Sequence, residues 1–131
     1  MVTFAETICV ALGGAAGALS RFGMQHFSFL DFEKYPNTIA VNLLGCMAIG
    51  VVWAILNAYN APIWLNRLVI AGFLGGFTTF STFALDFVIL ADVGKWGYAT
   101  GYVAISLTGG LLLCRASLWG TTQLIGQFSP Q

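Results

Sequence analysis

The chain is short of charge: its 131 residues include only five Lys or Arg and five Asp or Glu, together 8% of the sequence. Soluble domains usually carry about 25% charged residues, so this shortage excludes most soluble enzymes. The positive and negative side chains also cancel to a net charge of zero. Because no basic excess is left to neutralise phosphates, nucleic acid is excluded as an expected partner.

Residues that carry out chemistry are scarce as well. The only histidine is His26, and no pair of carboxylates lies near it. Cys9, Cys46 and Cys114 stand far apart without C-x-x-C spacing, which favours small apolar packing residues over metal ligands or disulfide partners. The sequence also lacks a nucleotide-binding loop, a serine elbow and paired carboxylates. We therefore predict that the protein is not an enzyme.

Long apolar runs take the place of charge. Hydrophobic residues make up 58% of the chain, the mean hydropathy is +0.84, and no charged residue occurs between Lys34 and Arg67. A membrane-spanning helix needs roughly 20 apolar residues. We predict an all-α integral membrane protein in which residues 1–131 form one domain of four spans, at about 3–25, 37–59, 64–91 and 96–125.

The distribution of Lys and Arg gives little preference for one orientation. Four spans place both termini on one side of the membrane, together with Arg67 and Arg115, whereas Arg21, Lys34 and Lys95 fall on the other. Either Arg21 lies inside the bundle and the remaining charges still select one orientation, or the chain inserts both ways. The small difference favours dual topology.

The third span contains an unusual cluster of glycine and hydroxyl residues between positions 72 and 82. Glycine and β-branched threonine are poor helix formers, so the helix is expected to break near the middle of the membrane. The alternative is a continuous helix that packs closely through Gly72 and Gly76. A break frees carbonyls that can coordinate a cation and N–H groups that attract an anion.

Two other features could serve either packing or transport. Phe80 and Phe83 are three residues apart and share a helix face, where their positive ring edges could solvate a small anion or simply pack. Asn42 could join two helices or offer an amide donor to a pore. Small residues four apart predict close helix packing, and they occur at Gly13/Gly17, Gly72/Gly76, Gly97/Gly101 and Ser106/Gly110.

Three motifs resemble those of the Fluc/CrcB fluoride channels. They are GGAAGALSR at 13–21, TIAVNLLG at 38–45 and GFLGGFTTFSTF at 72–83, in the family's order. The resemblance implies an antiparallel, dual-topology homodimer with two pores that exports fluoride passively across a bacterial inner membrane. It also implies a structural sodium ion at the dimer centre.

The resemblance also implies roles for individual residues. Phe80 and Phe83 would line each pore with their ring edges, and Asn42 would donate an amide N–H to the ion. Backbone carbonyls of Gly75 and Thr78 would hold sodium. The remaining implied positions are pore hydroxyls at Ser81 and Thr82, a polar track of Thr38, Tyr102 and Ser106, and vestibule residues Arg21 and Asp86.

The sequence departs from the family pattern in three places. Asp86 stands where glutamate is common, Asn37 replaces a glycine, and Gly110 occupies a track position that is often a hydroxyl residue. Two other functions compete with the channel: a dual-topology, proton-coupled exporter of cations, and a structural subunit of a larger membrane complex. The exporter would need a carboxylate in mid-span, whereas Glu6, Asp86 and Asp92 are expected toward span ends.

Overall fold

The computed structural model describes residues 2–26 and 35–128, and every regular element within these ranges is helical. Among the described residues, four helical stretches are long and apolar enough to cross a membrane: Phe4–His26, Asn37–Ala58, Ile63–Asp92 and Trp96–Gln127. This confirms the all-helical, four-span prediction. The charged residues Asp31, Glu33 and Lys34, which fall between the first two predicted spans, lie outside the described residues.

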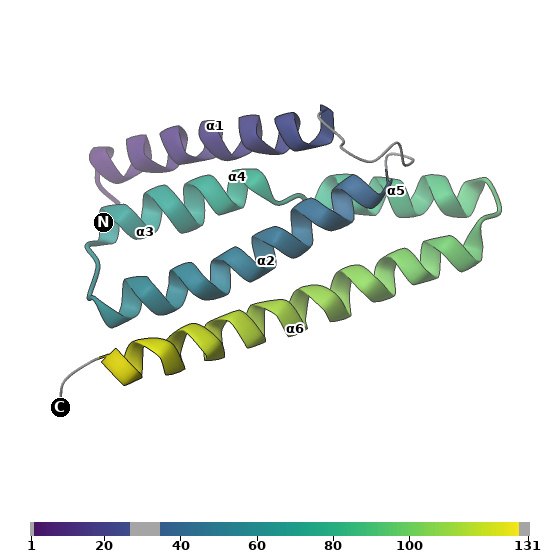
Figure 1. Cartoon of the computed structure of the whole chain (residues 1–131). Coiled ribbons are helices and arrows are strands. Elements are labelled where there is room, and N and C mark those ends of the chain that lie inside the picture. The colour runs from purple at the N-terminus through teal and green to yellow at the C-terminus, as the bar shows by residue number, and fades with distance from the viewer. Residues whose placement is uncertain (1, 27–34, 129–131) are drawn as a thin grey trace.

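The four stretches lie side by side along the molecule (Figure 1). Helix α1 (Phe4–His26) packs against the first half of the third stretch, and α2 (Tyr35–Ala58) packs mainly against α6 (Trp96–Phe128). The N- and C-terminal ends lie toward one end of the molecule, and the turn that leads into α6 lies at the other.

The third stretch consists of several short helical pieces. It runs through α3 (Ile63–Asn66), the π-helical segment η1 (Arg67–Leu74) and α4 (Gly75–Phe77), and it resumes as α5 (Phe80–Asp92). Between α4 and α5, Thr78 and Thr79 have extended backbones, with ψ angles of 158° and 117°. The sequence did not predict the π-helical turns, which are rare in proteins.

A reversal of the chain ends α5 and starts α6. Gly94 adopts a φ angle of +75°, a left-handed conformation that glycine tolerates without steric cost. The Lys95 N–H then donates to the carbonyl of Leu90 at 2.9 Å, and the Gly94 N–H donates to that of Ala91 at 2.9 Å. These bonds satisfy carbonyls at the end of α5 and turn the chain back along the bundle.

Glycines allow α1 to lie directly on the third stretch. A Cβ atom at Gly13 would lie 2.9 Å from the Phe73 nitrogen, and one at Gly76 would lie 2.5 Å from the Gly14 carbonyl oxygen. The predicted packing role is therefore confirmed for the pairs Gly13/Gly17 and Gly72/Gly76. At Gly97 and Gly101 an added Cβ would meet nothing within 4 Å in this chain.

Replacing Gly17 with alanine is expected to destabilise the fold. The new Cβ would collide with the Phe73 carbonyl oxygen and lie 2.8 Å from the Phe77 nitrogen. Backbone atoms cannot move aside cheaply, so the cost is about 1–3 kcal/mol and the thermal midpoint in detergent should fall by several degrees. Gly23→Ala is the matched control, because nothing lies within 4 Å of its added Cβ. Equal midpoints for the two variants would contradict the packing.

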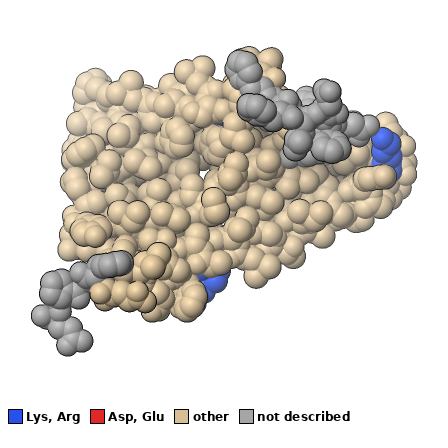
Figure 2. Space-filling model, viewed as in Figure 1, with Lys and Arg blue, Asp and Glu red and all other residues tan. Residues whose placement is uncertain are grey.

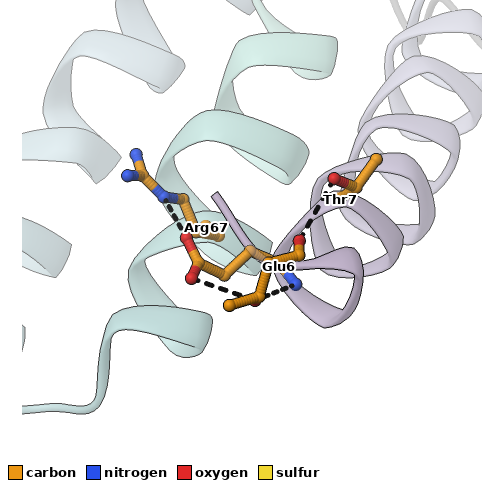
Figure 3. Close-up of polar contacts among 4 residues, drawn as sticks. Glu6, Thr7 and Arg67 are labelled. Carbon is orange, nitrogen blue, oxygen red and sulfur yellow. Dashed lines mark hydrogen bonds and ion pairs between the residues drawn. The ribbon is translucent and has the colours of Figure 1, made fainter. Parts of the chain in front are cut away.

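An ion pair joins the start of α1 to the start of η1 (Figure 3). The Arg67 Nε donates to Glu6 Oε2 at 3.2 Å, and the Thr3 hydroxyl donates to Glu6 Oε1 at 3.0 Å. The Glu6 N–H donates back to the Thr3 hydroxyl oxygen at 3.2 Å. Thr3 and Glu6 thus form a reciprocal cap on α1, and the Glu6 carboxyl is used for structure.

The outer surface is apolar. Several helices expose large hydrophobic side chains. Examples are Phe4 on α1 and Leu111 and Leu112 on α6. Figure 2 shows one face with Lys and Arg atoms only at its rim and no Asp or Glu atoms in view. Such a surface is suited to contact with lipid.

Candidate functional site

The third stretch is interrupted at Thr78 and Thr79, the two extended residues between α4 and α5. This interruption leaves backbone groups without helical partners. The N–H and hydroxyl of Thr78 both donate to the Leu74 carbonyl at 3.0 Å, which ends α4. The Thr79 N–H instead donates to Asn42 Oδ1 at 2.8 Å, so it does not bond the Gly75 carbonyl four residues earlier. An unsatisfied backbone group is costly inside a membrane. The side chains that reach this interruption are therefore needed to pair its backbone groups.

Asn42 holds Thr79 from the side of α2. Its Nδ2 donates to the Thr79 carbonyl at 2.9 Å, while its Oδ1 accepts the Thr79 N–H. Both backbone polar groups of one extended residue are thereby paired. Nδ2 carries a second N–H that the bond to Thr79 does not use. Asn42 therefore joins two helices and still has a donor for a ligand.

Thr79 also caps α5. Its hydroxyl oxygen accepts the Thr82 N–H at 3.2 Å, its hydroxyl donates to Thr82 Oγ1 at 3.0 Å, and Ser81 Oγ lies 3.4 Å away. The hydroxyls of Ser81 and Thr82 thus gather at the helix start. The motif alone did not single out Thr79, although a threonine before a new helix is a typical N-cap.

An open groove of about 350 Å³ runs beside the interruption. It brings together six of the predicted site residues with Thr79, and none of the described residues that line it is charged. The groove is lined by Asn42, Gly45, Cys46, Ile49, Ile70, Leu74, Gly75, Thr78, Thr79, Phe80, Phe83, Ser106 and Leu107. Gly75 and Phe80 lie on its exposed side.

Three aromatic rings lie in a row from the groove into the core. The Phe80 and Phe83 centroids are 5.6 Å apart at 42°, and the Phe83 and Tyr102 centroids are 5.2 Å apart at 18°. Phe80 is 76% exposed in the single chain, whereas Phe83 is 8% exposed. The two phenylalanines therefore share a helix face, as their spacing predicted, but in one chain only Phe83 is covered.

Asp86 lies deeper than the sequence suggested. We expected it at a vestibule toward a span end, but it is 2% exposed and accepts a hydrogen bond from the Tyr102 hydroxyl at 3.1 Å. Tyr102 itself is 4% exposed. The shorter aspartate side chain thus lies in the contact between α5 and α6 and does not itself line the groove.

Two buried hydroxyls have no hydrogen-bond partner among the described residues. They are Thr38 Oγ1 and Ser106 Oγ. Thr38 is 1% exposed and precedes Ile39, which packs against the buried cluster of Phe83, Leu90, Ala99 and Tyr102. Leaving a buried hydroxyl unpaired costs about 1–3 kcal/mol. These two groups are therefore candidates to bind water or an anion.

Arg21 reaches the interruption from α1. Its Nη1 donates to the Thr78 carbonyl at 3.0 Å, and Arg21 is not among the residues that line the groove. No cluster of three or more His, Cys, Asp or Glu is found within residues 2–26 and 35–128. A cation at this site would therefore be held by neutral oxygens, from backbone carbonyls or from amide and hydroxyl side chains, rather than by a cluster of carboxylates.

The sequence is similar to a protein family and to named bacterial proteins. A family model described as CrcB-like protein, Camphor Resistance (CrcB), matches residues 8–118. A protein of Pseudomonas putida named fluoride-specific ion channel FluC is 44% identical over 112 residues, covering 83% of this chain and 90% of its own length. A protein of Azotobacter vinelandii with the same name is 42% identical over 115 residues, covering 86% and 93%.

Proposed function

Because the chain belongs to the CrcB-like family, we propose that it is a fluoride-selective passive ion channel. The function is transport across a membrane rather than catalysis. The observation that carries the proposal is the groove beside Thr78 and Thr79. It is lined by Asn42, Phe80, Phe83 and Ser106, and within residues 2–26 and 35–128 no charged residue lines it. Neutral donors suit an ion that must be bound and released quickly.

The physical problem in conducting fluoride is the loss of water. Fluoride is small and strongly hydrated, so each lost water must be replaced by a donor. The second N–H of Asn42, the buried hydroxyls of Thr38 and Ser106, and the positive edges of the two phenylalanine rings offer such replacements. Each is weaker than a fixed cation, so the ion can bind and then leave.

The proposed channel needs a second copy of the chain. The groove is open and Phe80 is 76% exposed in one chain, so a partner would have to cover the groove. Arg21 binds at the interruption rather than at a helix end, which removes it from the count of orienting charges. The remaining Arg67 and Arg115 then equal Lys34 and Lys95 in number, so they select no single orientation, which argues against the alternative in which an Arg21 inside the bundle leaves one orientation favoured. The equality supports insertion in both orientations, and the protein is proposed to be an antiparallel, dual-topology homodimer with two pores in a bacterial inner membrane.

The Gly75 carbonyl near the interruption fits a structural sodium ion, whereas the Thr78 carbonyl accepts from Arg21 Nη1 at 3.0 Å and has only its second lone pair for such an ion. The Gly75 carbonyl does not receive the Thr79 N–H, and both Gly75 and Thr78 line the open groove. An added Cβ at Gly75 would meet nothing nearer than 3.7 Å, which leaves space beside this backbone. Two carbonyls from one chain are too few to hold a cation, so the partner would supply the others. When bound, sodium would stabilise the dimer and add a positive potential.

A flux assay tests the proposed function. Purified protein in liposomes, in sodium-containing buffer, is expected to release fluoride rapidly and to release no chloride. Phe80→Ile should lower the fluoride flux by about tenfold, because it removes a ring edge worth about 1 kcal/mol or more from the groove. A fluoride-selective electrode measures both rates.

Phe4→Ile is the matched control, since Phe4 is exposed at the start of α1, away from the groove. It should conduct like the parent. An absence of fluoride flux in the parent would refute the channel. A flux that follows an imposed proton gradient would favour the exporter, for which the Asp86 carboxyl would have to leave Tyr102.

A further inference from the structure

One face of α1 packs closely against the backbone of the third stretch, and the last residue on this face reaches the interruption. Gly13, Gly17 and Arg21 are spaced four residues apart, so they lie on the same side of the helix. An added Cβ at Gly13 would lie 3.1 Å from the Gly72 Cα, and one at Gly17 would lie 2.8 Å from the Phe77 nitrogen. The next position on this face, Arg21, bonds the carbonyl of Thr78. The glycine contacts therefore fix where the guanidinium lies.

The two extended residues, Thr78 and Thr79, are each held by a side chain from a different helix. Arg21 from α1 donates to the Thr78 carbonyl at 3.0 Å, and Asn42 from α2 pairs with both backbone groups of Thr79. These bonds replace those that a continuous helix would have made. Removing either side chain would leave a backbone polar group without its protein partner, which is costly inside a membrane protein.

The positive charge of Arg21 can be understood in two ways. In a vestibule it would attract anions through a field that any cation could provide. In this structure the guanidinium is instead bound to a backbone oxygen, and Arg21 does not line the groove. A guanidinium fixed on one acceptor has a geometric role in addition to its charge.

We propose that Arg21 is a positioning residue, which acts on the pathway through the Thr78 carbonyl. By holding that carbonyl, Arg21 fixes the backbone from which Thr79 caps α5 and Phe80 enters the groove. The expected effect of Arg21 on fluoride flux rests on the proposed channel function. Its expected effect on the backbone at Thr78 and Thr79 does not.

The test compares Arg21→Gln, Arg21→Lys and Arg115→Gln in reconstituted protein. Arg115 is exposed on α6, so its replacement removes the same charge without touching the interruption. Two quantities are measured: fluoride efflux, and hydrogen–deuterium exchange of backbone amides 78–83. This segment includes the Thr79 N–H bound to Asn42 and the Thr82 N–H bound to Thr79.

Arg21→Gln is expected to lower the flux and to raise exchange in this segment, each by about tenfold, as expected for the loss of a charge-assisted hydrogen bond. Arg21→Lys should recover part of both quantities, because an ammonium can donate to the same carbonyl with a shorter reach. Arg115→Gln should match the parent in both.

Two results would overturn the proposal. One is reduced flux in Arg21→Gln with parental exchange and full recovery in Arg21→Lys, which would assign the effect to charge alone. The other is no change in exchange for either Arg21 variant. If Arg21→Gln does not fold, Arg21→Lys decides alone. A role through charge attraction predicts that amides 78–83 of Arg21→Lys exchange at the parental rate, whereas a positioning role predicts that they exchange faster. No fluoride flux in the parent, together with faster exchange in Arg21→Gln, would reject the channel and support the positioning role.

Discussion

Asn42→Asp is expected to reduce fluoride flux by about a hundredfold or more. The carboxyl group keeps an acceptor for the Thr79 N–H but loses the Nδ2 donor, which now bonds the Thr79 carbonyl at 2.9 Å. Two oxygens then face each other at the interruption, and one carries negative charge beside the proposed anion path. A lost bond of about 1 kcal/mol or more and the repulsion of fluoride act in the same direction. Liposome efflux measures the result.

Asn57→Asp is the matched control on the same helix. Asn57 also donates its Nδ2 to a backbone carbonyl, that of Trp53 at 2.8 Å, but at an exposed position. It should conduct like the parent. Asn42→Leu removes both hydrogen bonds without adding charge, and it should conduct less than the parent but more than Asn42→Asp. Parental flux in folded Asn42→Asp would show that Asn42 does not belong to the pathway.

Tyr102→Phe is expected to lower fluoride flux by about tenfold, and Asp86→Asn in the same chain should restore most of it. The tyrosine hydroxyl donates to Asp86 Oδ2 at 3.1 Å, and both side chains are buried. Losing a donor to a buried carboxyl costs about 1.5–3 kcal/mol. Without this hydrogen bond, the Asp86 carboxyl would lie close to the Phe83 ring and would repel an anion there. Replacing the Asp86 carboxyl with an amide removes that repulsion.

Tyr98→Phe is the control for this pair, because Tyr98 is 76% exposed one turn earlier on α6. Its flux should equal that of the parent. Efflux from liposomes and the thermal midpoint should be measured for the two single variants and the double variant as one cycle. If Asp86→Asn gives no recovery in the Tyr102→Phe chain, the two residues act independently and the proposed link between them is wrong.

The fold was largely predictable because it depends on apolar length. Charge-free runs of about 20 residues leave few alternatives to helices in a membrane, and the four predicted stretches correspond to the four that the structure contains. The close approach of α1 was also predictable from Gly13 and Gly17. The π-helical turns of η1, the segment against which α1 packs, were not predicted.

The candidate site was predictable as a set of residues but less so as an arrangement. The third span was expected to carry the site because glycine and threonine weaken a helix there, and Phe80, Phe83 and Asn42 do lie along one groove. Thr79 was not anticipated, because its role comes from a bond made by Asn42, 37 residues away in sequence.

The sequence by itself determined that the chain is a membrane protein of four helices, since scarcity of charge and the length of apolar runs are properties of the chain alone. It also supplied the neutral donors, the aromatic pair and the near balance of Lys and Arg. Only the tertiary structure decided where the polar groups are used. Asp86 is buried by Tyr102, Asn42 is bound to Thr79, and Arg21 is bound to Thr78. These pairings join different helices, and their partners depend on how the helices pack, which no local pattern in the sequence specifies.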